Sequence, residues 1–173
     1  MGAVRGQTIV LDPGHNVGNW TDPAAINQHV FVGNGYKACD TTGTETDSGY
    51  TEAAFTFDVA TRMTALLQAA GANVMLTRTN NTGVGPCVNQ RAEIANKARA
   101  TVALSIHGDG NPPGGRGFQV LEPAPIPGYN TVIVAPRTAW RWMCGRTTRQ
   151  RLASRSRPTT GPTPSPCAAT SAA

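Results

Sequence analysis

The sequence has 173 residues, enough for one domain with its own core, and only 14% of them are charged. Together with 19 glycines and 13 prolines, this composition predicts a loop-rich globular chain and argues against intrinsic disorder. No run of 18 apolar residues is present, which argues against a membrane-spanning segment. The first ten residues lack the long apolar region of a signal peptide. We therefore expect either a cytosolic protein or an exported one whose signal is missing from this sequence.

The net charge of +5 is distributed unevenly along the chain. Residues 1–136 hold 8 Lys+Arg and 10 Asp+Glu, a charge of −2, whereas residues 137–173 hold 7 Arg and no acid, a charge of +7. Because the basic excess lies entirely in the last 37 residues, it does not indicate that the globular part binds nucleic acid. We expect no nucleic-acid partner, and DNA binding by the Arg-rich end is the weakest alternative.

The predicted elements begin with a short buried strand at Thr8–Leu11, which a Pro-Gly turn closes. Residues 16–49 contain scattered Gly, Asn, Thr and Asp and predict a long loop with one short strand at His29–Val32. Loops of this length in compact domains are usually functional. Apolar residues with a period near 3.6 then predict a helix over Tyr50–Ala70, and Gly71 is a suitable C-terminal stop.

The second half of the predicted domain continues the alternation of strands and helices. We expect a strand at Asn73–Thr77, a helix at Val88–Ala98, a strand at Thr101–Ile106 and a further strand at Gly117–Leu121. This order is typical of an α/β fold. The sequence thus predicts a single domain with a twisted mixed sheet flanked by helices.

Two histidines follow predicted strands, His15 in "LDPGH" and His107 in "SIHGDG". Ligands in open α/β sheets bind outside the carboxyl ends of the strands, so both imidazoles are expected at one edge. A catalytic zinc site takes three protein ligands and leaves one position open. The pair therefore predicts a metal site, although a histidine after a strand is more often an ordinary loop or core residue.

Four carboxylates are candidates for the third ligand. They are Glu45, Asp47, Glu52 and Asp109. Glu52 is favoured because it lies in the first turn of the predicted helix, close to the expected sheet edge; its alternative role is a favourable charge at the helix N-terminus. Asp12 and Asp109 are candidates for orienting the ligands through hydrogen bonds. His29 is a weaker candidate ligand in the long loop.

Five motifs in order resemble one known family. They are "IVLDPGHN", "GYTEAAFTFDVATRM", "VMLTRT", "QRAEIANKARATVALSIHGDG" and "GRGFQV". They resemble the catalytic domain of zinc-dependent N-acetylmuramoyl-L-alanine amidases of the amidase-3 type, and the match runs from about Ile9 to Val120. The resemblance implies one zinc ion bound by His15, Glu52 and His107. It also implies hydrolysis of the amide between muramic acid and L-alanine in peptidoglycan. We expect an exported, monomeric enzyme of the periplasm or cell wall.

The resemblance also implies features that concern the cysteines and a general base. Cys39 and Cys87 resemble a disulfide of actinobacterial members, and two free thiols are the alternative. In the family a second, late glutamate serves as the base, but the last acidic residue here is Glu122. It follows the Gly117–Leu121 strand too closely to match, so we assign no catalytic base in this sequence. We expect impaired hydrolysis, with a non-catalytic peptidoglycan-binding pseudoenzyme that retains the zinc site as the alternative.

The end of the sequence differs in character from the rest. We expect the truncated catalytic domain to span residues 7–136, followed by an Arg/Thr/Pro-rich tail at 137–173 that includes Cys144 and Cys167. One interpretation is a disordered basic tail. Another is a shifted reading frame, because permitted codons in the neighbouring frame encode a segment with apolar residues at helical spacing.

Overall fold

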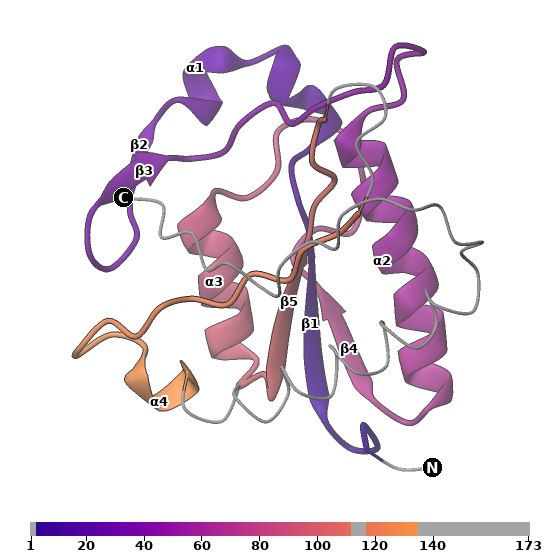
Figure 1. Ribbon diagram of the computed structural model, residues 1–173, viewed down its shortest axis with the longest axis vertical. Helices are drawn as coiled ribbons and strands as arrows, with labels where there is room; N and C mark the ends of the chain where they lie inside the picture. The colour runs from indigo at the N-terminus through magenta and orange to yellow at the C-terminus, as the bar shows by residue number, and fades with distance from the viewer. Residues whose placement is uncertain (1–2, 112–116, 135–173) are drawn as a thin grey trace, which may run out of the picture. The chain divides into compact units, whose positions relative to one another are not determined.

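The computed structural model describes residues 3–111 and 117–134 (Figure 1). The chain divides into two compact units, residues 1–114 and 115–173. The predicted boundary at residue 136 and the tail at 137–173, with Cys144 and Cys167, lie outside the described residues. Within the described part, no helix combines the length and the apolar character that crossing a membrane requires.

The first unit is built on a three-stranded parallel sheet. Strand β1 (Thr8–Pro13) is central, between β4 (Asn73–Leu76) and β5 (Val102–Ile106). A strand that is covered on both faces needs a continuous apolar run, which "IVL" in β1 supplies. Ile9, Val10 and Leu11 are accordingly all buried. The α/β class is confirmed, and every described strand of this sheet runs parallel to its neighbours.

Two helices connect the strands of this sheet. Helix α2 (Glu52–Ala69) precedes β4, and helix α3 (Val88–Lys97) leads from β4 to β5. Crossover connections between parallel strands are right-handed, and the chain first moves one way from β1 and then back across it. The two helices are therefore expected on opposite faces, and Figure 1 shows the strands between α2 and α3. Their predicted ranges were correct within two residues.

One face of the sheet packs on α2 to form the core. Ile9 and Leu11 of β1 are buried against Ala60 and Ala72. Partly buried neighbours complete this cluster: Val4, Met63, Leu67, Val74, Leu76 and Ile106. Truncating a buried leucine to alanine typically costs about 2–5 kcal/mol, so Leu11 contributes strongly to the stability of the strand that carries the site.

The segment between β1 and α2 contains more regular structure than the sequence predicts. It forms a 3₁₀ turn η1 (Val17–Trp20), a short helix α1 (Pro23–Ile26) and an antiparallel hairpin of β2 (His29–Phe31) and β3 (Tyr36–Ala38). The predicted strand at His29–Val32 is confirmed with one residue fewer. Its partner was missed because a three-residue strand carries too few residues to show an alternating pattern.

Only residues 117–134 of the second unit are described. They contain the short helix α4 (Thr131–Val134), which the sequence did not predict. The predicted strand at Gly117–Leu121 is wrong, because these residues have no strand partner in the described part of the chain. An apolar, β-branched pattern becomes a strand only when another strand is present to pair with it.

Candidate metal centre

The strand register brings His15 and His107 together. Pro13 of β1 pairs with Ile106 of β5, and the Gly14 amide donates to the Ile106 carbonyl at 3.0 Å. The residues that follow these two strand ends are therefore neighbours. The two imidazole rings lie 4.9 Å apart, edge to face. The prediction that both histidines share one edge of the sheet is confirmed.

His15 itself has a left-handed backbone conformation, with a φ of 59°. Residues other than glycine and asparagine rarely adopt this conformation, which costs about 1–3 kcal/mol. Gly14 is required beside it, because a Cβ atom there would lie 2.3 Å from the His107 ring. The sharp turn "PGH" thus aims the His15 imidazole back across the end of the sheet.

Two buried arginines hold this turn. Arg78 donates to the carbonyls of Pro13 and Gly14, and Arg91 donates to those of Pro13 and His15. These carbonyls lie at or just beyond the end of β1, and buried carbonyls need partners. The guanidinium groups supply several donors in a fixed plane. The turn is therefore held by one arginine from the loop after β4 and one from α3, and not by its own local structure.

Glu52 lies at the first position of α2, where Thr51 provides the N-cap by accepting from the Ala54 amide. The amide of Gly108 donates to one carboxylate oxygen, Oε1, at 2.9 Å, and the amide of Thr44 donates to the other, Oε2, at 3.0 Å. The side chain is only 5% exposed. Two backbone donors and burial thus fix the direction in which this carboxylate points.

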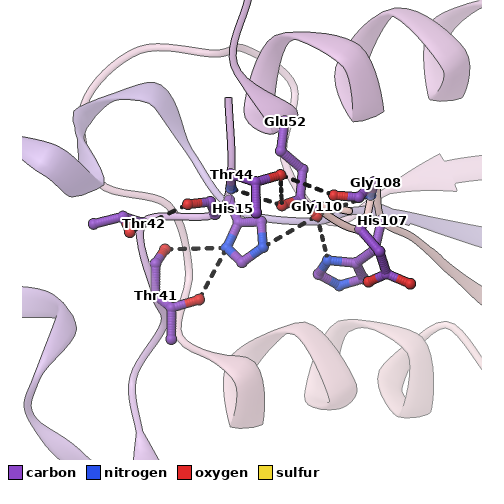
Figure 2. Close-up of a pocket in the computed structure, with 10 residues that line it drawn as sticks. His15, Thr41, Thr42, Thr44, Glu52, His107, Gly108 and Gly110 are labelled. Atoms are coloured by element: carbon purple, nitrogen blue, oxygen red, sulfur yellow. Dashed lines mark hydrogen bonds and ion pairs between the residues drawn. The ribbon is translucent and has the colours of Figure 1, made fainter. Parts of the chain in front are cut away.

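Oε1 of Glu52 lies close to both imidazoles (Figure 2). It is 3.3 Å from Nε2 of His15 and 2.9 Å from Nδ1 of His107. One ligand atom from each of the three residues lies within 4.8 Å of the other two. Figure 2 shows the Glu52 side chain reaching from the start of α2 toward both rings. Sequence reasoning named these three residues, and the structure brings all three together.

The other nitrogen of His15, Nδ1, faces the loop that follows β3. It lies 3.0 Å from the Thr41 carbonyl and 3.1 Å from Oδ1 of Asp40. A carbonyl only accepts, so Nδ1 carries the proton, and in the neutral ring Nε2 presents a lone pair to Glu52. Two acceptors 3.3 Å apart repel unless a cation or a proton lies between them. The donor set therefore suits a metal cation.

The charges of the cluster influence one another. Burial raises the pKa of Glu52, but the Gly108 and Thr44 amides and the two histidines outweigh it and hold that pKa below its ordinary value. Burial lowers the pKa of His15, but the contact with Asp40 and the charge of Glu52 outweigh it and raise that pKa. Glu52 is therefore an anion at neutral pH, as a metal ligand must be.

The cluster opens into a cleft of about 460 Å³. Its lining combines the three residues with the loop before α2 and the residues after β5: His15, Thr41, Thr42, Gly43, Thr44, Glu52, His107, Gly108, Asp109 and Gly110. Gly43 has a φ of 76°, and a Cβ there would lie 2.9 Å from the His15 ring. This glycine permits the loop to pass directly over the site.

The remaining candidates lie elsewhere or play other parts. Glu45 and Asp47 are exposed in the loop, and His29 is exposed in β2; none belongs to the cluster. Asp109 lines the cleft. Asp12 was expected beside a ligand, but its carboxylate instead contacts Arg91, Thr77 and Ser105. The candidates were separated by the direction of each side chain, which spacing along the chain does not determine.

The structure also identifies residues that sequence reasoning missed. Asp40 and Thr41 contact His15, Thr44 holds Glu52, and two arginines hold the turn. Arg78 had one available signal, because it closely follows the apolar run "VML" of a predicted strand, and an arginine is buried only when it is paired; Arg91 lies in a polar helix and had none. Asp40 had none of its own, since an acid in a polar loop is ordinarily a surface residue.

Cys39 and Cys87 form a disulfide that spans 48 residues of sequence. It joins the loop after β3 to the residue at the N-terminal end of α3. The Val88 amide also donates to the Cys39 carbonyl at 2.8 Å. The disulfide that the resemblance implied is therefore present, and it lies beside both Asp40 and α3.

Comparisons with known proteins agree with this arrangement. The profile of the family described as N-acetylmuramoyl-L-alanine amidase matches residues 9–157. The chain belongs to this amidase family. It is 42% identical over 123 residues to an N-acetylmuramoyl-L-alanine amidase of Mycobacterium tuberculosis, a match that covers 70% of this chain and 50% of the relative.

Two solved structures are similar to the chain. The N-acetylmuramyl-L-alanine amidase Ami1 of Mycobacterium smegmatis has a TM-score of 0.68 and 42% identity, with coverage of 75% of this chain and 59% of Ami1. The apo form of Ami1 from Mycobacterium abscessus has a TM-score of 0.59 and 39% identity, with coverage of 63% and 50%. The chain thus spans about half the length of the curated relative it matches.

Proposed function

We propose that the chain is a zinc-dependent peptidoglycan amidase domain that acts on the amide between N-acetylmuramic acid and L-alanine. The observation that carries this proposal is the convergence of His15, Glu52 and His107 at the floor of one cleft. Two neutral imidazoles and a carboxylate are an ordinary ligand set for catalytic zinc, which keeps a further position open. Membership of the amidase family and the names of the relatives support the choice of substrate.

A zinc ion at this site would polarise the amide carbonyl and lower the pKa of a water molecule. The residues of the chain supply the conditions for that chemistry. Glu52 stays ionised because two amides donate to it. The contacts of His15 with Asp40 and Thr41 leave Nε2 free to bind a cation. The cleft is open above His107, whose side chain is 48% exposed, so an extended substrate can reach the ligands.

The proposed reaction needs a general base, and the described cleft offers few carboxylates for that role. Among the described residues that line the cleft, the carboxylates are Glu52, which is held as a ligand, and Asp109. The sequence contains no acidic residue after Glu122. General acid–base groups contribute about 10²–10⁴-fold to a rate. We therefore propose that hydrolysis by this chain is reduced by a factor of that order relative to a full-length amidase.

A non-catalytic peptidoglycan binder is the second candidate function. The same observation favours it. The three proposed ligands are present, but the sequence has no acidic residue after Glu122 that could act as the base. Such a site could hold a metal and a substrate without hydrolysing it. The two candidates differ in a paired experiment on isolated cell-wall sacculi. If the chain is an amidase, the zinc-loaded protein releases stem peptides from sacculi. If it is a binder, the protein sediments with the sacculi and releases no stem peptide.

The direct test of the amidase proposal is product analysis. The chain is incubated with a muropeptide in the presence of zinc, and release of the free stem peptide is followed by mass spectrometry. We expect slow release that requires zinc and is lost when Glu52 is replaced. Zinc-independent release, or release at the rate of a full-length amidase, would contradict the proposal in its metal or its acid–base part, respectively.

We further propose that the protein works outside the cytoplasm as a monomer. The Cys39–Cys87 disulfide supports export, since such bonds persist in oxidising compartments, and peptidoglycan is found there.

We also propose that the catalytic domain ends at residue 136 and that the reading frame shifts there. Sequencing the DNA around codon 136 tests both: a coding pattern that continues in the neighbouring frame supports them, and one that continues in the printed frame refutes them.

A further inference from the structure

We propose that Asp40 is a positioning residue that fixes His15 with its proton on Nδ1 and its Nε2 directed at the metal position. This inference rests on the metal site of the proposed function. It concerns the residues behind the ligand, on the side away from the cleft. The geometry of three groups carries it: the His15 imidazole, the Asp40 carboxylate and the Arg91 guanidinium.

The first step concerns the imidazole. Its Nδ1 lies 3.1 Å from Oδ1 of Asp40 and 3.0 Å from the Thr41 carbonyl. Both are acceptors, so together they select the tautomer with Nδ1 protonated. The side chain of His15 is only 10% exposed, so water does not offer a competing donor. In Figure 2 Thr41 lies on the far side of the His15 ring from Glu52.

The second step concerns what holds Asp40. The carboxylate is buried, and a buried charge needs partners. The amide of Thr41 donates to Oδ1 at 2.8 Å, and Arg91 lies 3.3 Å from Oδ2. These two donors hold the carboxylate in place, so Asp40 presents Oδ1 to the histidine.

The third step connects Asp40 to the disulfide. Cys39 directly precedes Asp40, and Cys87 directly precedes α3, which carries Arg91 on its first turn. The bond therefore joins the two segments that supply the carboxylate and the guanidinium. Arg91 also contacts Asp12 of β1 at 2.9 Å. A covalent link and two ion pairs thereby tie the loop after β3, helix α3 and the strand β1 into one support for His15.

Carboxylates that accept from a metal-bound histidine fix its orientation and raise its basicity, and replacing them typically costs 10–100-fold in metal affinity. We therefore expect Asp40→Ala to weaken zinc binding about 10–100-fold. Asp40→Asn should lose less, because its amide oxygen still accepts from Nδ1. The matched control is Asp22→Asn, since Asp22 caps α1 and has no contact with His15 among the described residues.

The test measures the zinc affinity of the 173-residue chain and its variants by competition with a chromophoric chelator. Disulfide formation and circular dichroism are checked for each variant. The order parent, Asp40→Asn, Asp40→Ala, with Asp22→Asn equal to the parent, supports the inference. A folded Asp40→Ala protein whose zinc affinity lies within threefold of the parent overturns it.

A second measurement needs no variant and no metal. Long-range ¹H–¹⁵N spectra of the metal-free parent, at a pH where imidazole is neutral, report which nitrogen of His15 carries the proton. A proton on Nδ1 supports the inference, and a proton on Nε2 overturns it, even where Asp40→Ala does not fold. If the parent binds no zinc, the proposed function fails while this spectrum still tests which nitrogen of His15 carries the proton.

Discussion

The two histidines of the cluster occupy very different surroundings, although each follows a strand of the same sheet. The side chain of His15 is 10% exposed and contacts Asp40 and Thr41 through the nitrogen that faces away from Glu52. The side chain of His107 is 48% exposed, and its Nδ1 lies 2.9 Å from Glu52 itself. His15 is held by hydrogen bonds on the side away from the cleft, and His107 is placed by strand register and by contact with Gly14.

This difference indicates that the buried and the exposed sides of the site have different roles. The buried side fixes direction, through Arg91, Asp40 and the disulfide, and its burial requires that every polar group be paired. The exposed side borders the cleft, where the proposed substrate would enter. Changes on the buried side are expected to affect both folding and metal binding, and changes on the exposed side mainly metal binding.

Glu52 connects the two sides, so replacing it should have the largest effect. Glu52→Ala removes one of the three proposed protein ligands and leaves the Gly108 and Thr44 amides without their acceptor. A zinc binding free energy of about 10–16 kcal/mol is shared among few ligands, so we expect a loss of affinity of about 10³-fold. Chelator competition measures it, with Glu93→Ala on the surface of α3 as the control. An affinity within tenfold of the parent would show that Glu52 is not a ligand.

The disulfide belongs to the buried side, and its loss should be the next largest effect. Replacing both Cys39 and Cys87 by serine frees a loop of 48 residues in the unfolded chain. Loop-closure entropy for this length predicts a loss of about 4 kcal/mol in the free energy of unfolding. Urea denaturation of the metal-free protein measures it. A double variant as stable as the parent would mean that the bond contributes nothing to holding the buried side.

Removing each histidine separately tests the comparison itself. We choose His15→Asn and His107→Asn, because asparagine tolerates the left-handed backbone at residue 15. Without metal, His15→Asn should reduce stability by about 1–3 kcal/mol, since buried Asp40 loses a partner, and His107→Asn by less than about 1 kcal/mol. Thermal denaturation in the presence of a chelator compares them. Equal losses would remove the distinction between a supported and an exposed ligand.

The smallest effect concerns acid stability through Asp12, which contacts Arg91 on the buried side. Burial raises the pKa of Asp12, but hydrogen bonds from Ser105 and Thr77 and the charge of Arg91 outweigh it, and that pKa is lowered. A lowered pKa stabilises the fold above the unfolded value of about 3.9, and this stability is lost as the pH falls through the folded value.

Asp12→Asn should therefore cost about 1 kcal/mol at pH 7 and make the fold less sensitive to acid below about pH 4. Denaturant titrations at pH 7, 5 and 3 measure the effect, and Asp58→Asn in an exposed pair with Arg62 is the control. A variant with the same acid dependence as the parent would show that Asp12 is not a source of it.

The sequence predicted the parts of the fold that local patterns determine. The apolar run of β1, the period of α2 and the Gly71 stop gave element ranges close to those observed. Two histidines after two strands predicted the sheet edge where the site lies, since parallel strands place their carboxyl ends together. Glu52 was favoured for a related reason, its place at the start of a helix.

What remained unpredicted depends on contacts between distant segments. Asp40 reaches His15 only because the hairpin returns the chain over the turn, 25 residues later. Arg91 reaches the same turn from 76 residues away. Asp12 was a candidate for orienting a ligand through a hydrogen bond, yet β1 directs it toward Arg91 and Thr77. The predicted strand at Gly117–Leu121 was wrong because an apolar pattern does not by itself provide a second strand to pair with.

The central claim is that His15, Glu52 and His107 together bind one zinc ion. Isothermal titration of the metal-free, disulfide-bonded protein with zinc tests it most directly, beside His15→Asn, Glu52→Ala and His107→Asn. The account predicts one zinc per chain for the parent and a loss of tight binding in each of the three variants. Tight binding of one zinc ion by all three variants, as in the parent, would contradict it.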